Sequence, residues 1–108
     1  MLKAMAPLAA LLTACGVGPQ APTLDSVSKM SGGLMVEWTN KEVGCDTVEV
    51  ERKMMGEPYG MVFTLAGDIN NKHDTAATGD MDYSYRLRCH KANLYSAYSN
   101  EKTANPVR

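Results

Sequence analysis

Histidine, cysteine and aromatic residues are scarce in this sequence. Its 108 residues include two histidines and three cysteines, and aromatic residues make up 6% of the chain. Cys89 and His90 are consecutive, so in a strand they would point to opposite faces, and His73 lies far from them in sequence. Zinc sites need several nitrogen and sulfur ligands at close spacing. We therefore expect no metal and no other cofactor.

Motifs of catalysis are missing as well. The chain has no phosphate-binding glycine loop, no nucleophile elbow and no zincin motif, so we expect that it is not an enzyme. The aspartates are interpreted as turn residues that bond to nearby backbone: Asp68, Asp74, Asp80 and Asp82. Of the eight methionines, two lie near the N-terminus and Met54-Met55 is the only close pair left. Core filling and chance explain them better than copper binding.

Positive and negative charges are nearly balanced in this sequence. Eleven basic and twelve acidic residues give a net charge of −1 and are spread along the sequence. Without a basic stripe, a nucleic-acid partner is not expected. Hydrophobic residues make up 44% and charged residues 21%, which is typical of a globular chain of one small domain.

The N-terminal apolar run is too short to cross a bilayer, which takes about 20 residues. It extends from Ala4 to Leu12, contains Pro7 and follows Lys3. Its length and flanks are typical of a secretory signal. The run ends in Leu12-Thr13-Ala14-Cys15, which resembles the lipobox of bacterial lipoproteins.

That resemblance implies cleavage before Cys15 and acylation of its thiol and its new amine. We therefore expect a lipoprotein signal peptide at residues 1–14 and a flexible tether at residues 15–21. Gly16 stands where the family has Asp for retention in the inner membrane, which implies the outer membrane if the host has one. Several acyl chains, at about 0.8 kcal/mol per buried CH₂, would make the membrane anchor permanent. The alternative is an uncleaved apolar arm.

The rest of the chain alternates in short stretches and shows no helical periodicity. The clearest stretch is 82–89, where Tyr83, Tyr85, Leu87 and Cys89 alternate with polar residues. This pattern predicts a half-buried strand with one apolar face and one cationic, solvated face. Further strands are expected at residues 23–30, 34–39, 47–53, 61–65, 73–78 and 96–103. About seven short antiparallel strands predict an all-β sandwich over residues 22–105.

Alternation also assigns residues to the core. Leu34, Val36 and Trp38 share one face, and Trp38, the single tryptophan, is expected at the centre of the core. Glu49 and Glu51 are expected to point outward. The other residues expected to point inward are Val48, Val50, Met61, Phe63, Leu65 and Leu87.

The order and spacing of these features resemble a fibronectin type III domain of bacterial surface and secreted proteins. The resemblance covers residues 22–104 and rests on Pro22, Trp38, the Tyr83-Ser-Tyr-Arg-Leu run and Ser96-Ala-Tyr-Ser99. It implies an immunoglobulin-like β-sandwich with a tyrosine corner at Tyr83, whose hydroxyl would bond back to the preceding turn. Gly79-Asp80 departs from the Pro-Gly that the family has before this corner.

The family topology has further implications. It makes the strand at 47–53 an antiparallel neighbour of 82–89, which places Cys45 beside Cys89. An exported protein keeps its disulfides, so we expect a Cys45–Cys89 bridge, with two free thiols as the alternative. The topology also brings the loops at 40–45, 66–72 and 93–95 to one pole. There Asn93, Leu94 and Tyr95 are candidate binding residues; the alternative for Leu94 and Tyr95 is a loop that packs on its own core.

These features predict a lipid-anchored bacterial cell-envelope protein whose single module binds or scaffolds another protein. The partner would be a membrane protein or the lipid surface, and exposed edge strands offer a second binding route by strand addition. The alternative is a structural or decorating protein of a phage particle or surface assembly, with residues 1–21 as an arm. Lipidation at Cys15 distinguishes the two hypotheses.

Overall fold

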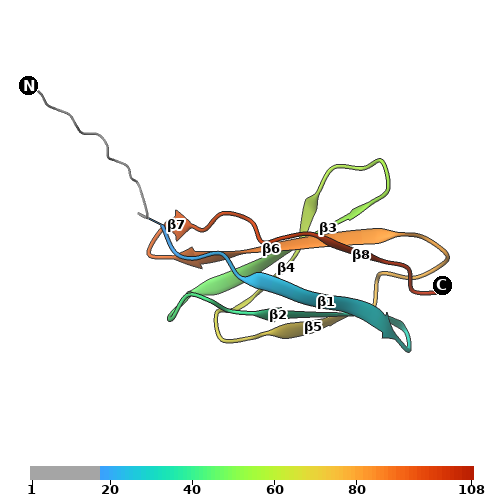
Figure 1. Ribbon diagram of the computed structural model, residues 1–108, viewed down its shortest axis with the longest axis horizontal. Helices are drawn as coiled ribbons and strands as arrows, with labels where there is room; N and C mark the ends of the chain where they lie inside the picture. The colour runs from blue at the N-terminus through green and yellow to red at the C-terminus, as the bar shows by residue number, and fades with distance from the viewer. Residues whose placement is uncertain (1–17) are drawn as a thin grey trace, which may run out of the picture.

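The computed structural model describes residues 18–108; Cys15 and the predicted signal peptide at residues 1–14 lie outside the described residues. The described chain forms eight β-strands and no helix (Figure 1), so none of it forms a helix that could span a membrane. The strands are β1 (Thr23–Met30), β2 (Gly33–Thr39), β3 (Thr47–Met54), β4 (Gly60–Ala66), β5 (Asn71–Asp74), β6 (Tyr83–Lys91), β7 (Leu94–Tyr95) and β8 (Lys102–Ala104).

Two antiparallel sheets pack face to face (Figure 1). The first has the order β1-β2-β5, and the second has the order β4-β3-β6-β7, with β8 also paired to β6. This arrangement confirms the predicted all-β, immunoglobulin-like sandwich. The clearest alternating stretch of the sequence, 82–89, lies in β6, which pairs with β3 on one side and with β7 and β8 on the other.

The hydrophobic core lies between the sheets and follows the predicted alternation. Trp38 is buried among the residues of both sheets, and its indole N–H donates to Asn40 Oδ1 at 3.1 Å. A buried indole N–H needs such a partner. The other buried apolar residues are Leu24, Leu34, Val36, Val48, Val50, Ala77, Tyr83, Tyr85, Leu87 and Cys89.

Met61 does not enter the core, contrary to the prediction for β4. Opposite β3, the register is regular from Thr47↔Ala66 to Val50↔Phe63 and then shifts, so that Glu51 faces Met61. Val62 is left over as a β-bulge, and a bulge reverses the side-chain alternation beyond it. Val62 therefore packs against the core, whereas Met61 is exposed.

The fifth strand begins two residues before the predicted segment 73–78 and ends at Asp74. Its pairing with β2 runs from Glu37↔Asn71 to Leu34↔Asp74, and residues 75–76 already form a turn. Asp74 accepts the N–H of Ala76 at 3.1 Å, as a turn aspartate does. However, its side chain is fully buried, which the turn interpretation missed.

Asp74 Oδ2 is the centre of a buried polar cluster. The guanidinium of Arg52 and the hydroxyl of Tyr85 both donate to it at 2.7 Å. Burial and the bond to Asp74 raise the pKa of Tyr85, so this phenol stays protonated and serves as a donor. The cluster lies inside the sandwich and joins β3, β5 and β6.

The predicted last strand, 96–103, is regular only at its end, in β8. Before β8, two serine hydroxyls replace ladder bonds: Ser96 Oγ accepts the N–H of Cys89 at 2.8 Å and Ser99 Oγ accepts the N–H of Leu87 at 2.9 Å. The N–H groups of these serines donate back to the same two residues of β6. The Ser-x-Tyr-Ser sequence therefore fixes this segment along β6 without a continuous strand.

The methionines of the described chain do not fill the core, contrary to the interpretation from sequence. Met35 is half-buried in β2, on the face of the sheet that points away from the core. The exposed methionines are Met30, Met54, Met55, Met61 and Met81. A flexible thioether suits adaptable surfaces as well as cores, and here five of them are on the surface.

Candidate functional site

Two residue assignments implied by the family resemblance match the structure. The hydroxyl of Tyr83 donates to the carbonyl of Thr78 at 2.8 Å, which is the bond of a tyrosine corner. Cys45 and Cys89 form a disulfide, with their Cα atoms 5.8 Å apart. Cys45 lies in the loop before β3, so the alternation of β3 does not constrain its direction.

The disulfide belongs to a group of three connected loops at one pole, residues 40–46, 67–70 and 91–95, which we call the tip. Lys91 Nζ donates to the carbonyl of Val43 at 2.7 Å and pairs with Glu42 at 2.9 Å. Asn40 Nδ2 donates to the carbonyl of Ile69 at 2.9 Å. Each loop of the tip is therefore bonded to another one, as the predicted clustering of the loops required.

The segment that contains the predicted loop 93–95 is a tight β-hairpin. Lys91 pairs with Leu94 and His90 pairs with Tyr95 across it, and the two turn residues have positive φ, 50° at Ala92 and 67° at Asn93. Two such residues make the type I′ turn that suits a two-residue hairpin. Asn93 therefore forms the turn, while Leu94 and Tyr95 are each 48% exposed.

Gly67 lies against the disulfide loop. A Cβ at this position would overlap the carbonyl oxygen of Cys45, so the two loops touch because residue 67 has no side chain. We expect Gly67→Ala to lower the free energy of unfolding by about 1–3 kcal/mol, as overpacking does. Urea denaturation measures the change. Gly60→Ala is the control, because a Cβ at Gly60 meets nothing within 4 Å; equal losses in both variants would contradict this contact.

The described end of the predicted tether is attached to the tip. The N–H of Gln20 donates to Glu42 Oε1 at 2.8 Å, and a Cβ on Gly18 would lie 3.3 Å from the carbonyl oxygen of Tyr95. The bond from Gln20, followed by that from Lys91, holds the pKa of Glu42 below the ordinary 4.5. The backbone at Gln20 is therefore bonded to a carboxylate whose lowered pKa favours its ionised form.

This attachment should depend on pH. A lowered pKa means that ionised Glu42 stabilises the contact above the ordinary glutamate pKa, and that the contact is lost as pH falls through the lowered value. We expect the amide NMR signal of Gln20 to shift with a midpoint below pH 4.5. In Glu42→Gln this titration should disappear. A midpoint at or above 4.5 would show that the carboxylate gains nothing from Gln20.

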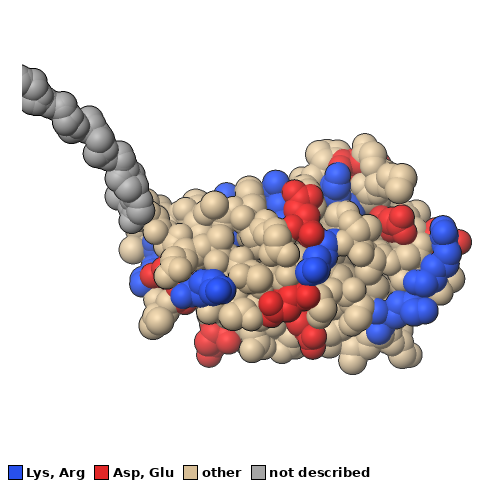
Figure 2. All heavy atoms as spheres, viewed as in Figure 1, with Lys and Arg blue, Asp and Glu red and all other residues tan. Residues whose placement is uncertain are grey.

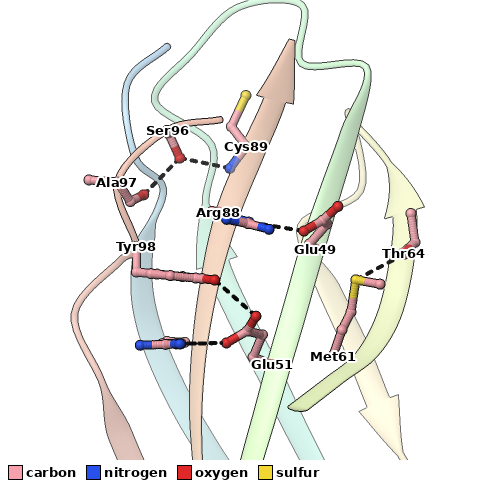
Figure 3. A network of polar contacts seen from close by, with 10 residues as sticks. Glu49, Glu51, Met61, Thr64, Arg88, Cys89, Ser96, Ala97 and Tyr98 are labelled. Atoms are coloured by element: carbon pink, nitrogen blue, oxygen red, sulfur yellow. Dashed lines mark hydrogen bonds and ion pairs between the residues drawn. The ribbon is translucent and has the colours of Figure 1, made fainter. Parts of the chain in front are cut away.

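The outward face of β6 is neutralised, and not the solvated cationic face that the sequence predicts. Arg86 pairs with Glu51 at 2.8 Å, and Arg88 pairs with Glu49 at 2.9 Å. The partners stand opposite each other in the β3–β6 register. Both glutamates point outward as predicted, but they are buried. Arg88 bonds to Glu49, and Arg86 and Tyr98 bond to Glu51. Figure 3 shows the Arg88–Glu49 pair.

Tyrosine rings alternate with the two guanidinium groups on this face. Arg86 Cζ lies 3.7 Å from the ring centroid of Tyr98 and 4.2 Å from that of Tyr59. Arg88 Cζ lies 3.9 Å from the centroid of Tyr95 and 5.0 Å from that of Tyr98. These distances are typical of cation–π contacts. We call the row Tyr59–Arg86–Tyr98–Arg88–Tyr95 the ladder.

Hydrogen bonds fix the orientation of the ladder. The hydroxyl of Tyr98 donates to Glu51 at 3.0 Å, as Figure 3 shows, and that of Tyr59 donates to Glu101 at 2.8 Å. Burial, followed by the bond to Glu101, raises the pKa of Tyr59. At the other end, the ring of His90 stacks on Tyr95 at 4.5 Å. The ladder is therefore a surface of tyrosine rings and paired charges that are bonded to one another.

Among residues 18–108, no three His, Cys, Asp or Glu side chains come together as metal ligands would. Charges of both signs are interspersed over the face drawn in Figure 2. The two surfaces, the tip and the ladder, present exposed aromatic side chains and ion pairs between neighbouring strands.

No protein-family model and no curated protein matches the chain. Solved structures do match. A Fn3-like protein from Clostridium thermocellum is 25% identical, with a TM-score of 0.67, over 80% of this chain and 91% of that protein. A β-1,2-glucanase from Parabacteroides distasonis is 19% identical (TM-score 0.72), and pectate lyase PelI from Erwinia chrysanthemi is 21% identical (TM-score 0.68). They match 82% and 78% of this chain, which spans only 13% and 27% of these enzymes.

These similarities define the class of the domain. Its two antiparallel sheets, its tyrosine corner and its match to the Fn3-like protein from Clostridium thermocellum make it a β-sandwich of the fibronectin type III-like fold. The chain is therefore an immunoglobulin-like module, as the sequence motifs predicted.

Proposed function

We propose that this protein is a lipid-anchored module of the bacterial cell envelope that binds a partner protein and catalyses no reaction. The lipobox ending at Cys15 supports the anchor, and the Cys45–Cys89 disulfide supports export to an oxidising compartment. Gly16 after the cysteine favours the outer membrane where the host has one. The observation that carries the binding role is the ladder.

Three properties of the ladder favour a protein as its ligand. Tyrosine and arginine are the residues that contribute most at protein interfaces. The ladder side chains are already held in place by their neighbours, so binding costs little conformational entropy. The guanidinium groups of Arg86 and Arg88 cover ring faces, which leaves mainly ring edges for contacts. A sugar that stacks on a ring face fits this arrangement less well than a protein surface does.

The intact mass of the protein from its native membranes tests the anchor. We expect a chain that starts at Cys15, carries acyl mass and gains two hydrogens on reduction of the Cys45–Cys89 bridge. An unmodified mass counted from Met1 would refute the anchor. It would favour the alternative of a structural or decorating protein with residues 1–21 as an arm.

Cross-linking in intact cells tests the role of the ladder. We expect the native protein to give one discrete adduct with a protein partner, and Tyr59→Leu to weaken this adduct at least fivefold. Met55→Leu is the matched control, because Met55 lies in the same β3–β4 connection, outside the ladder, and is exposed. Equal adducts in the two variants, with unchanged melting temperatures, would exclude the ladder as the binding surface.

A further inference from the structure

We infer that the tip of the domain rests in the interfacial layer of the lipid bilayer. This inference rests on the proposed anchor at Cys15 and adds a second contact, made by the domain itself. It concerns the pole at which the ladder ends, and the tip shares one residue, Tyr95, with the ladder.

The tip exposes apolar side chains from all three of its loops. Val43 is 87% exposed, Leu94 and Tyr95 are each 48% exposed, and Ile69 is 38% exposed. Exposed apolar residues that gather in one place mark an interaction surface more often than scattered ones do. Tyrosine, with an apolar ring and a polar hydroxyl, is enriched at membrane–water interfaces.

The contacts of the tip keep these side chains together. Lys91 bonds to the carbonyl of Val43 and lies opposite Leu94 in the hairpin, and Asn40 bonds to the carbonyl of Ile69. The Cys45–Cys89 disulfide closes the group covalently. A preformed surface loses little entropy when it is transferred to an interface.

The position of the anchor determines which surface meets the membrane. Gly18 follows Cys15 by three residues, and three residues reach roughly 10 Å at most. Gly18 itself lies beside the backbone of Tyr95, and the described chain begins next to β7 (Figure 1). An acylated Cys15 would therefore hold the tip within a distance comparable to the roughly 5–10 Å depth of interfacial insertion.

The charges of the tip permit this contact. Lys91 and Glu42 neutralise each other in an ion pair, and Asp46 accepts the N–H of Ala92 at 2.9 Å. Lys41 and Asp68 are exposed and of opposite sign. No large field of one sign repels the headgroups, so the apolar side chains decide the preference.

Tryptophan fluorescence in vesicles tests the inference. The full-length lipoprotein carrying Leu94→Trp or Val43→Trp is reconstituted in brominated phosphatidylcholine, which quenches tryptophans that touch it. Met55→Trp serves as the matched control at the opposite pole, and the buried Trp38 gives a constant background. We expect the emission added by Leu94→Trp and Val43→Trp to fall at least twofold relative to unbrominated lipid, and that of Met55→Trp to stay unchanged.

The outcomes separate the inference from the anchor. If neither tip tryptophan is quenched in a chain whose mass shows acylation, the membrane contact is overturned and the proposed anchor stays intact. Quenching of Met55→Trp to the same extent would also overturn it, because the domain would then have no preferred face. A mass without acyl chains would refute the anchor and, with it, the inference.

Discussion

Asp74→Ala is expected to lower the free energy of unfolding by about 3–5 kcal/mol, the range for breaking a buried ion pair from one side. Asp74 is fully buried and accepts from both Arg52 and Tyr85. Without the carboxylate, a cation and a buried hydroxyl lose their partner together. A buried donor without a partner costs the full free energy of its desolvation, unless a water molecule enters and takes the place of the carboxylate.

Chemical denaturation of matched variants measures this effect. Tyr85→Phe removes one donor and leaves the ion pair with Arg52 in place, so we expect a smaller loss of about 1 kcal/mol. Asp25→Ala is the surface control: Asp25 is exposed and, within residues 18–108, accepts a side-chain hydrogen bond from Thr39 alone, at 2.7 Å, so its loss should stay within about 0.5 kcal/mol. An Asp74→Ala loss as small as that of Asp25→Ala would contradict a structural role for this cluster.

Removing the disulfide by Cys45→Ala together with Cys89→Ala should cost about 4 kcal/mol in the chain-entropy model. The bridge joins positions 44 residues apart, so it restricts a large part of the unfolded chain. The same bond ties the first loop of the tip to the end of β6. The double variant should therefore also loosen the contact between Gly67 and the loop at Cys45.

The denaturation midpoints of the native protein and of the double variant, each measured with and without reductant, provide the internal control. The native protein should lose stability on reduction, whereas the double variant should not respond. Faster hydrogen exchange of the amides at 40–46 would show the local loosening. If both proteins unfold at the same midpoint without reductant, the bridge contributes nothing to stability.

Most of the fold was predictable, because alternation with a period of two depends only on local sequence. The alternating apolar residues of β6, and those of the segment that contains Leu34, Val36 and Trp38, correctly predicted two strands and their inward faces. The similarity to fibronectin type III domains then supplied the order of the strands, and with it the Cys45–Cys89 pairing and the bond from Tyr83.

The errors concern features that arise between strands. Met61 points outward because of a bulge, and a bulge is visible only in the register of β4 against β3. Asp74 has an ordinary turn sequence, and its burial depends on Arg52, which comes from another strand. Alternation correctly placed Arg88 on the outer face, but it could not show that Glu49 and two tyrosine rings would meet it there.

The bulge at Val62 has a consequence for the behaviour of the protein at high concentration. In the described chain, β4 is an edge strand, because it has a partner strand on one side only. It contains no charged residue between Gly60 and Ala66. An uncharged, regular edge of this kind would pair readily with the same edge of a second molecule. The bulge interrupts that regularity and twists the strand. It therefore protects the domain from aggregation through an edge that has no charge to prevent it.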